Sequence, residues 1–129
     1  MIKAEDLRIG DLVRYGKDII TILATHADGL VCFADGKDQI CVEHVLLEPI
    51  PLTPEILEKN GWKKRTEGWY FMMISKYMYL SVEFGYENGI RVFLKRTTDG
   101  LYVKLNVANN VHELQHILWA LGLDSNLKI

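Results

Sequence analysis

Residues 109–123 (NNVHELQHILWALGL) decide the fold that the sequence predicts for this chain of 129 residues. On a helical wheel, at about 100° per residue, the apolar side chains of this stretch gather on one side. They are Val111, Leu114, Ile117, Leu118 and Leu121. A helix of about 12 residues is marginal alone in water, so its apolar side must pack on another element. We expect Asn109 or Asn110 to cap the helix start by accepting a backbone N–H bond, and a left-handed Gly122 to end the helix.

The opposite side of the predicted helix carries His112 and His116 with the His-Glu-x-x-His spacing of zinc hydrolases. In such an enzyme both imidazoles would bind zinc, and Glu113 would activate a water. A catalytic zinc needs a third protein ligand, and Asp124 is the only good candidate after His116. We therefore predict no metal site, no cofactor and no enzymatic activity, and retain a small zinc hydrolase as a minor alternative.

Trp119 shares this polar side of the helix, and its indole indicates that the side is not simply solvated. Residues 69–74 (WYFMMI) form a predicted strand that is apolar on both faces, and the face turned away from the core needs a cover. We predict that these side chains contact the amino-terminal half, a second copy of the chain or another protein. The predicted partner surface consists of His112, Gln115, His116, Trp119, Trp69 and Phe71.

The amino-terminal part of the sequence indicates short strands separated by turns. The predicted strands are residues 12–15, 19–26, 30–34 and 39–42. Asp28-Gly29 and Asp35-Gly36 supply the hairpin loops, because a tight hairpin needs the positive φ that Gly adopts cheaply and Asp tolerates. Strands this short must curl to bury a core, so we predict a small SH3-like β-barrel over residues 1–50.

A proline-containing link, residues 48–52 (EPIPL), follows the predicted barrel. Its two prolines disfavour both a helix and a central strand. Thr53 then caps a short helix with Pro54 at its first position, and Asn60-Gly61 ends that helix. This helix opens a second predicted domain, residues 51–129.

The second domain is predicted to hold four antiparallel strands. They are residues 69–74, 78–86, 90–96 and 101–107. One face of this sheet is apolar and should be covered by both helices, which makes the fold class α+β, in the order α-β-β-β-β-α. The apolar face carries Leu80, Val82, Phe84, Val92, Leu94, Val103, Leu105 and Val107.

Two hairpin loops set the predicted register of this sheet. A two-residue loop at residues 99–100 (DG) places Leu94 opposite Leu105, so that apolar faces match. A two-residue Asn-Gly loop in the preceding hairpin would place an apolar face opposite a polar one. We therefore expect a three-residue loop at 87–89 (ENG) with Gly89 left-handed, which places Leu94 opposite Val82.

Two stretches, residues 50–62 (IPLTPEILEKNGW) and 111–116 (VHELQH) continuing to Ala120-Leu121, resemble a group of short uncharacterised proteins of Bacteroides-group bacteria and their phages. The group has a proline-flanked PLT helix start with a Gly-aromatic stop, and a closing helix with His, Leu and Gln in the positions of His112, Leu114 and Gln115. The resemblance covers the two motifs well and most of the chain loosely. It implies a phage or mobile-element origin and no known activity. Because the positions of Glu113 and His116 are not fixed in the group, it argues against a metal site.

Single-stranded nucleic acid is a second kind of partner, because basic side chains interleaved with aromatic ones suit such a ligand. Residues 1–51 carry five basic and nine acidic side chains, whereas residues 52–129 carry ten and eight. The net charge of -2 and the presence of Glu83 argue against this alternative. The residues that would bind nucleic acid are Lys63, Lys64, Arg65, Arg91, Phe93, Lys95, Tyr102 and Lys104.

Cys32 and Cys41 have neither the two-residue gap of a redox pair nor the clustering of a zinc site, so we expect reduced, mostly buried thiols. His26 and His44 are expected at strand ends or on the surface rather than as metal ligands. No apolar run approaches the ~18 residues of a membrane span, and the acidic start is unlike a signal peptide. We predict a cytoplasmic, non-enzymatic protein-interaction module without a membrane partner.

Overall fold

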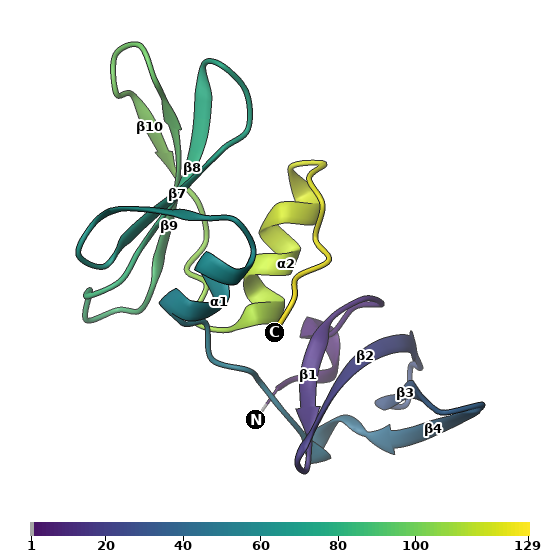
Figure 1. Cartoon of the computed structure of the whole chain (residues 1–129). Coiled ribbons are helices and arrows are strands. Elements are labelled where there is room, and N and C mark those ends of the chain that lie inside the picture. Colours follow the sequence, from purple (N-terminus) through teal and green to yellow (C-terminus); the bar gives the residue numbers. More distant parts are fainter. Residues whose placement is uncertain (1) are drawn as a thin grey trace.

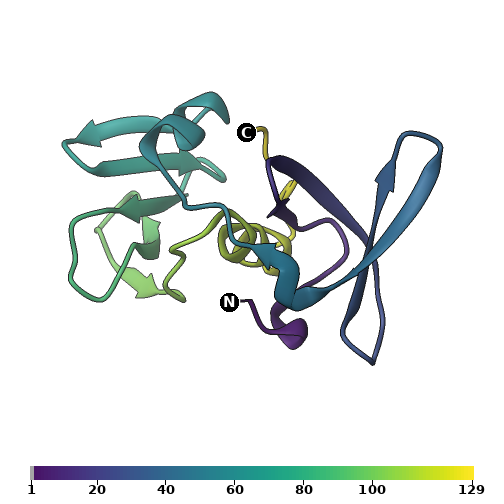
Figure 2. The ribbon, with the colours of Figure 1, turned by 90° about the horizontal axis from the view of Figure 1, so that it is seen from below.

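Residues 2–129 are described by the computed structural model, which has two five-stranded antiparallel sheets with helix α2 between them (Figure 1, Figure 2). The first half contains η1 (Ala4–Asp6), β1 (Leu12–Tyr15), β2 (Asp18–Thr25), β3 (Leu30–Asp35), β4 (Asp38–Glu43), η2 (His44–Leu46) and β5 (Leu47–Glu48). The second half contains α1 (Pro54–Lys59), β6 (Lys63–Thr66), β7 (Trp69–Met73), β8 (Met78–Glu83), β9 (Arg91–Arg96), β10 (Tyr102–Lys104) and α2 (Val111–Ala120). The predicted α+β class is confirmed.

The first sheet has the strand order β4-β3-β2-β1-β5 and curls around its own core (Figure 1). That core includes Val13, Ile20, Ile22, Val31, Phe33 and Leu47. The four strands predicted here are confirmed to within two residues at their ends. The sequence did not indicate β5, because two residues are too few to show a period-two pattern.

The proline-containing link is fixed to the start of α2 rather than extended between two separate units. The N–H of Val111 donates to the carbonyl of Ile50 at 2.8 Å, and the N–H of Leu52 donates to the carbonyl of Asn109 at 3.0 Å. Ile50 and Leu52 are both buried in the core of the second half. The Thr53 cap is confirmed, since its Oγ1 accepts the N–H of Ile56 at 3.3 Å.

The second sheet has five strands, in the order β10-β9-β8-β7-β6, and not the four that were predicted. The additional strand is β6 (KKRT), which pairs with β7 at the edge of the sheet and is exposed along its whole length. A strand that buries none of its side chains has no hydrophobic period, so sequence patterns do not reveal it.

Both hairpin registers of this sheet are shifted by two residues from the prediction. Leu94 lies opposite Leu80 and not Val82, and it lies opposite Val103 and not Leu105. At the second hairpin the Asp99 carboxylate accepts the N–H of Leu101 at 3.1 Å and widens the loop to residues 97–100. A shift of two residues keeps every side chain on its face, so the predicted apolar face is preserved.

The Asn109 side chain bonds to the loop at Gly89 and Ile90 and does not cap α2. Gly89 has φ of 110°, as expected for a positive-φ glycine, and Asn109 Oδ1 accepts the N–H of Ile90 at 2.9 Å. Asn110 occupies the N-cap position, but its side chain donates to Glu113, and no side-chain bond to the helix backbone caps α2 within residues 2–129. The prediction of an asparagine cap is therefore wrong, whereas left-handed Gly122, with φ of 73°, is confirmed.

The main core lies between the inner face of the second sheet and the two helices. Leu80, Val82 and Val92 pack there against Leu114 and Leu118 of α2, which are 0% and 1% exposed. Each such leucine contributes roughly 1.5–3 kcal/mol by its burial.

The helices do not cover the whole inner face of this sheet. Val103, which was predicted on the covered apolar face, is 60% exposed. It lies in edge strand β10, which α2 does not reach (Figure 1).

Cys32 and Cys41 form a disulfide, so the prediction of reduced thiols is wrong. They lie directly opposite each other on β3 and β4, with a Cα–Cα distance of 4.0 Å. Their nine-residue separation carried no signal, because only the register of the hairpin brings them together. Cys32 is buried, but Cys41 is exposed.

Among residues 2–129, no helix is long and apolar enough to cross a membrane.

Candidate functional site

The polar side of α2 is bonded to the first sheet through Gln115. Its Oε1 accepts the N–H of Leu12 at 2.8 Å, and its Nε2 donates to the carbonyls of Gly10 and Ser125 at 3.0 Å each. The side chain is 3% exposed, so these bonds form away from water. Gln115 therefore joins α2, the start of β1 and the carboxyl-terminal segment.

His116 is paired with a buried carboxylate of the first half. Its Nε2 lies 2.9 and 2.8 Å from the two carboxylate oxygens of Asp11. Asp11 is 2% exposed and also accepts the N–H of Arg8 at 2.8 Å. No local sequence pattern links the two partners, because they are 105 residues apart.

His112 is buried beside this pair. It is 4% exposed, its ring centroid lies 5.7 Å from that of His116, and its Nδ1 has no hydrogen-bond partner among the described residues. Burial lowers the pKa of His112 from its ordinary value, and the nearby carboxylates of Asp11 and Glu113 oppose that shift only in part. The folded protein therefore favours a neutral His112.

The arrangement does not assemble the zinc site of the minor alternative. Glu113, the base in that hypothesis, accepts a hydrogen bond from the Asn110 side chain at 2.8 Å. The Nε2 atom of His116, which would bind the zinc, is instead hydrogen-bonded to the Asp11 carboxylate. In residues 2–129, the one group of three potential metal ligands is His26, Cys32 and Cys41, far along the chain from α2.

A cleft of about 460 Å³ lies between η1, α2 and the segment after β10. Its polar lining is Asp6, Arg8, Asn106, His112, Glu113 and His116. No Ser, Thr, Cys or Lys of the described residues lines it, and its two carboxylates are those of Asp6 and Glu113.

Trp119 does not pack into the contact between α2 and the first sheet. Its side chain is 68% exposed, and the guanidinium carbon of Arg8 lies 5.9 Å from its ring centroid. Of the predicted α2 surface, Gln115 and His116 therefore bond within the chain, and Trp119 remains available to another molecule.

The second sheet brings the remaining predicted residues together on the face that points away from the helices. Strand pairing sets Lys95 between Tyr79 and Tyr102, Phe93 between Ser81 and Lys104, and Glu83 between Trp69 and Arg91. We call this surface the outer face. It consists of Lys63, Arg65, Trp69, Phe71, Tyr79, Ser81, Glu83, Arg91, Phe93, Lys95, Tyr102 and Lys104.

Aromatic rings on the outer face contact one another edge to face. The ring centroids of Phe71 and Tyr79 are 6.1 Å apart, and those of Phe93 and Tyr102 are 5.4 Å apart. Lys95 Nζ lies 5.2 Å from the Trp69 ring centroid and 5.3 Å from the Phe93 ring centroid, and so connects Trp69 to the second pair. Sequence analysis named four of these five aromatic residues and missed Tyr79.

A buried carboxylate, Glu83, organises the centre of the outer face. It is 2% exposed and accepts bonds from Ser81 at 2.8 Å, Lys95 at 2.7 Å and Tyr86 at 3.1 Å. Burial raises the pKa of the Tyr86 hydroxyl, and its bond to Glu83 adds to that shift. The negative charge of Glu83 is thus matched by Lys95 and does not face solvent.

The other basic side chains differ in what they contact. Arg65 donates to the Tyr79 hydroxyl at 2.9 Å, and Arg91 stacks 4.2 Å from the Tyr86 ring centroid. Lys64 instead pairs with Glu67 at 2.7 Å, which raises the pKa of the lysine. Lys63, Arg65, Arg91 and Lys104 are therefore the cations of the outer face that no carboxylate among the described residues neutralises within salt-bridge distance.

Comparison with known proteins gives no match to a protein-family model, a curated protein or a solved structure. The resemblance to short proteins of Bacteroides-group bacteria and their phages therefore stays a prediction. Function has to be argued from the geometry of the outer face and of α2.

Proposed function

We propose that this chain is a non-enzymatic binding module that holds single-stranded nucleic acid on the outer face of its second sheet. The observation that supports this most directly is the row of aromatic and basic side chains on a sheet face that neither helix covers. Every base has a flat face that can stack on an aromatic ring, and lysine or arginine neutralises the phosphates.

The spacing of the two most accessible rings supports this ligand. Trp69 and Tyr102 are 36% and 64% exposed, and they lie on β7 and β10, which are three strand spacings apart. At about 4.8 Å per spacing, the two positions are roughly 14 Å apart across the sheet. Trp69 pairs in the row of Arg91 and Tyr102 in the row of Lys95, four residues or roughly 13 Å further along the strands, so the two positions are roughly 20 Å apart. An extended strand can span that distance and place one base on each ring.

The charges of the outer face agree with an anionic ligand. Because Lys95 matches Glu83, the four remaining cations give the face a net positive charge, although the whole chain carries -2. Each phosphate contact should lower the slope of log affinity against log salt by roughly 0.7.

The test is fluorescence anisotropy of a labelled random-sequence single-stranded DNA oligonucleotide at low salt. Wild-type protein should bind it, and the affinity should fall as salt rises. Tyr102→Ala should weaken binding about 5- to 150-fold, since one stacked base contributes roughly 1–3 kcal/mol. Lys104→Ala should make the negative slope of log affinity against log salt shallower by roughly 0.7, because one phosphate contact is lost.

Trp119→Ala is the matched control, because Trp119 is equally exposed but lies on α2, away from the outer face. It should bind the oligonucleotide as the wild type does. Absence of binding at low salt, or equal losses in Trp119→Ala and Tyr102→Ala, would contradict the proposal.

A protein partner is the second candidate, and the exposed edge of the second sheet favours it. Leu101, Tyr102 and Val103 are 60% to 64% exposed at β10, and an apolar edge strand can pair with a strand of another chain. In the same experiment, a dimeric mass by light scattering without oligonucleotide binding would favour this candidate.

The strand order of the first sheet supports an SH3-like description of the first half, because β1 lies between β2 and β5 in a curled five-stranded sheet.

A further inference from the structure

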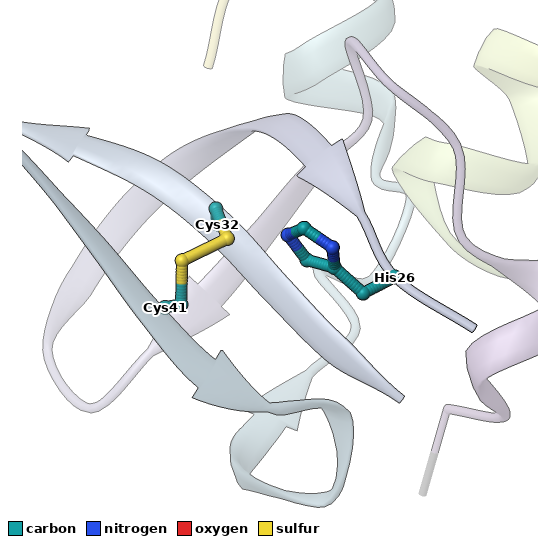
Figure 3. Close-up of side chains that lie close together, drawn as sticks. All are labelled: His26, Cys32 and Cys41. Atoms are coloured by element: carbon teal, nitrogen blue, oxygen red, sulfur yellow. A yellow bond between two sulfur atoms is a disulfide. The ribbon is translucent and has the colours of Figure 1, made fainter. Parts of the chain in front are cut away.

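His26, Cys32 and Cys41 form a cluster outside the surfaces described above. Their potential ligand atoms all lie within 4.8 Å of one another, and Figure 3 shows the imidazole of His26 beside the disulfide sulfurs. Cys32 is buried, whereas His26 and Cys41 are exposed, so the cluster opens to solvent on one side.

Strand pairing explains why these residues meet. Cys32 lies opposite Cys41 on one side and opposite Ala24 on the other. His26 follows Ala24 by two residues, and a period of two returns its side chain to the same face of the sheet. The N–H of His26 donates to the carbonyl of Leu30 at 2.9 Å, which holds the histidine at the start of the β2–β3 turn.

We propose that reduction of the Cys32–Cys41 disulfide creates a site for a divalent zinc ion, with both thiolates and the His26 imidazole as its protein ligands. Two thiolates and an imidazole are preferred zinc ligands. Zinc–ligand distances of roughly 2.3 Å to sulfur and 2.0 Å to nitrogen require neighbouring ligand atoms roughly 3.5 Å apart. The two sulfur atoms must separate to reach that geometry, and the imidazole, which lies within 4.8 Å of both, must shift by roughly 1 Å.

The chemistry balances when a dithiol supplies the electrons. The dithiol is oxidised to its own disulfide, and its two electrons and two protons convert the Cys32–Cys41 bond into two thiols. Zinc then displaces both protons as the thiolates bind, so one ion enters and two protons leave. Three protein ligands leave a fourth, open coordination position for water or another ligand.

Reduction leaves the surrounding structure able to hold the ligands in place. Strands β3 and β4 pair along their whole length, from Leu30 with Glu43 to Asp35 with Asp38. The hairpin therefore does not depend on the disulfide for its register. Cys41 is exposed, which gives a reductant access to one of the sulfur atoms.

The experiment uses the full chain reduced with a phosphine and freed of reductant under anaerobic conditions. Cobalt(II) alone is the probe, because its thiolate charge-transfer absorption reports sulfur ligands directly. Reduced protein should bind one equivalent with this absorption, and added zinc should displace it. Oxidised protein should show none. Cys41→Ser should lose the thiolate absorption or most of it.

His26→Gln separates a three-ligand site from a simple dithiol. It should weaken cobalt binding by at least about tenfold, the loss that even an outer-shell partner of a metal ligand causes. His44→Gln is the matched control, since it removes a histidine of the same half that lies outside the cluster, and it should bind cobalt as wild type does. A native circular dichroism spectrum of each variant shows that the fold is retained.

The proposal is overturned if reduced wild-type protein shows no thiolate absorption with cobalt. It is equally overturned if His26→Gln binds cobalt as tightly as the wild type, or if the oxidised protein binds cobalt in the same way.

Discussion

Single polar residues on α2 have contacts that follow from their position on the helix rather than from the motif they spell. His112, Gln115 and His116 lie on the side opposite Leu114 and Leu118, as the helical period predicts. The first half of the chain then covers most of that side, so Gln115 is 3% exposed and His112 4% exposed. Two side chains of the motif, Gln115 and His116, are therefore used in contacts within the chain.

The pH dependence of stability should report the burial of His112. The pKa of His112 is lowered in the folded state. In the unfolded chain His112 binds a proton near the ordinary pKa of about 6.5, whereas in the folded chain it stays neutral at that pH. The contribution of His112 to stability is therefore present above about pH 6.5 and is lost as the pH falls below it. Urea unfolding at a series of pH values should show a smaller acid loss in His112→Gln than in the wild type.

His26→Gln, which removes an exposed imidazole, is the control for that series and should keep the wild-type pH profile. An acid loss of equal size in His112→Gln and in wild type would mean that His112 is not the group responsible.

At the scale of elements, the second sheet shows what a strand pattern determines. The side chains of the predicted apolar face that lie within paired strands share one face, yet both hairpins are two residues out of the predicted register. A one-residue shift of the strand register would move every apolar side chain to the other face, so the alternating pattern excludes it. A two-residue shift leaves each side chain on its face, so the pattern cannot exclude that shift. The loops decide between the two registers, through Asp99 at one hairpin and the Gly89–Asn109 contact at the other.

Replacement of Gly89 tests that contact. An added Cβ would lie 2.3 Å from Asn109 Oδ1, and φ is 110° there, so Gly89→Ala must displace the acceptor of the Ile90 N–H. Gly100→Ala is the matched control, with φ of 72° and nothing within 4 Å of the added Cβ.

The control should lose about 1–2 kcal/mol, the cost of a left-handed alanine. Gly89→Ala should lose about 1–3 kcal/mol more, the cost of an unsatisfied backbone group. Equal losses in urea unfolding would show that Asn109 does not hold this loop.

At the scale of the whole molecule, α2 belongs to both halves of the chain. The helix lies between the two sheets (Figure 2). Its apolar side completes the core of the second sheet, and its polar side bonds to β1 of the first. The link between the halves is also hydrogen-bonded to the start of α2, at Ile50 and Leu52. The two halves are therefore connected through α2 as well as through the chain itself. We expect the two sheets to unfold together for this reason.

Gln115→Leu should uncouple the two halves. It leaves the buried Leu12 N–H and the Gly10 carbonyl without partners, and at about 1–3 kcal/mol for each unsatisfied group the loss should be about 2–6 kcal/mol. Hydrogen exchange should show amides of β1 to β3 opening before those of β8 and β9 in this variant, but together with them in the wild type.

Gln39→Leu is its matched control, since Gln39 is an exposed glutamine on β4 and its replacement should change stability by less than about 0.5 kcal/mol. If Gln115→Leu leaves both the stability and the order of exchange unchanged, Gln115 does not couple the halves.

The sequence by itself determined the local features: the helix with its buried leucines, the Thr53 cap, nearly all strands and the face on which each side chain lies. Hydrophobic periods and turn residues act over a few neighbours, so one sequence contains that information. Short or wholly polar strands such as β5 and β6 have no such period.

The tertiary structure alone decided the Asp11–His116 pair, the position of Gln115 between the halves, the disulfide and the gathering of aromatic and basic side chains on the outer face. Asp11 and His116 are separated by 105 residues, and no local pattern couples positions so far apart. Such contacts depend on the exact register and docking of elements, which only the packing of the whole chain selects.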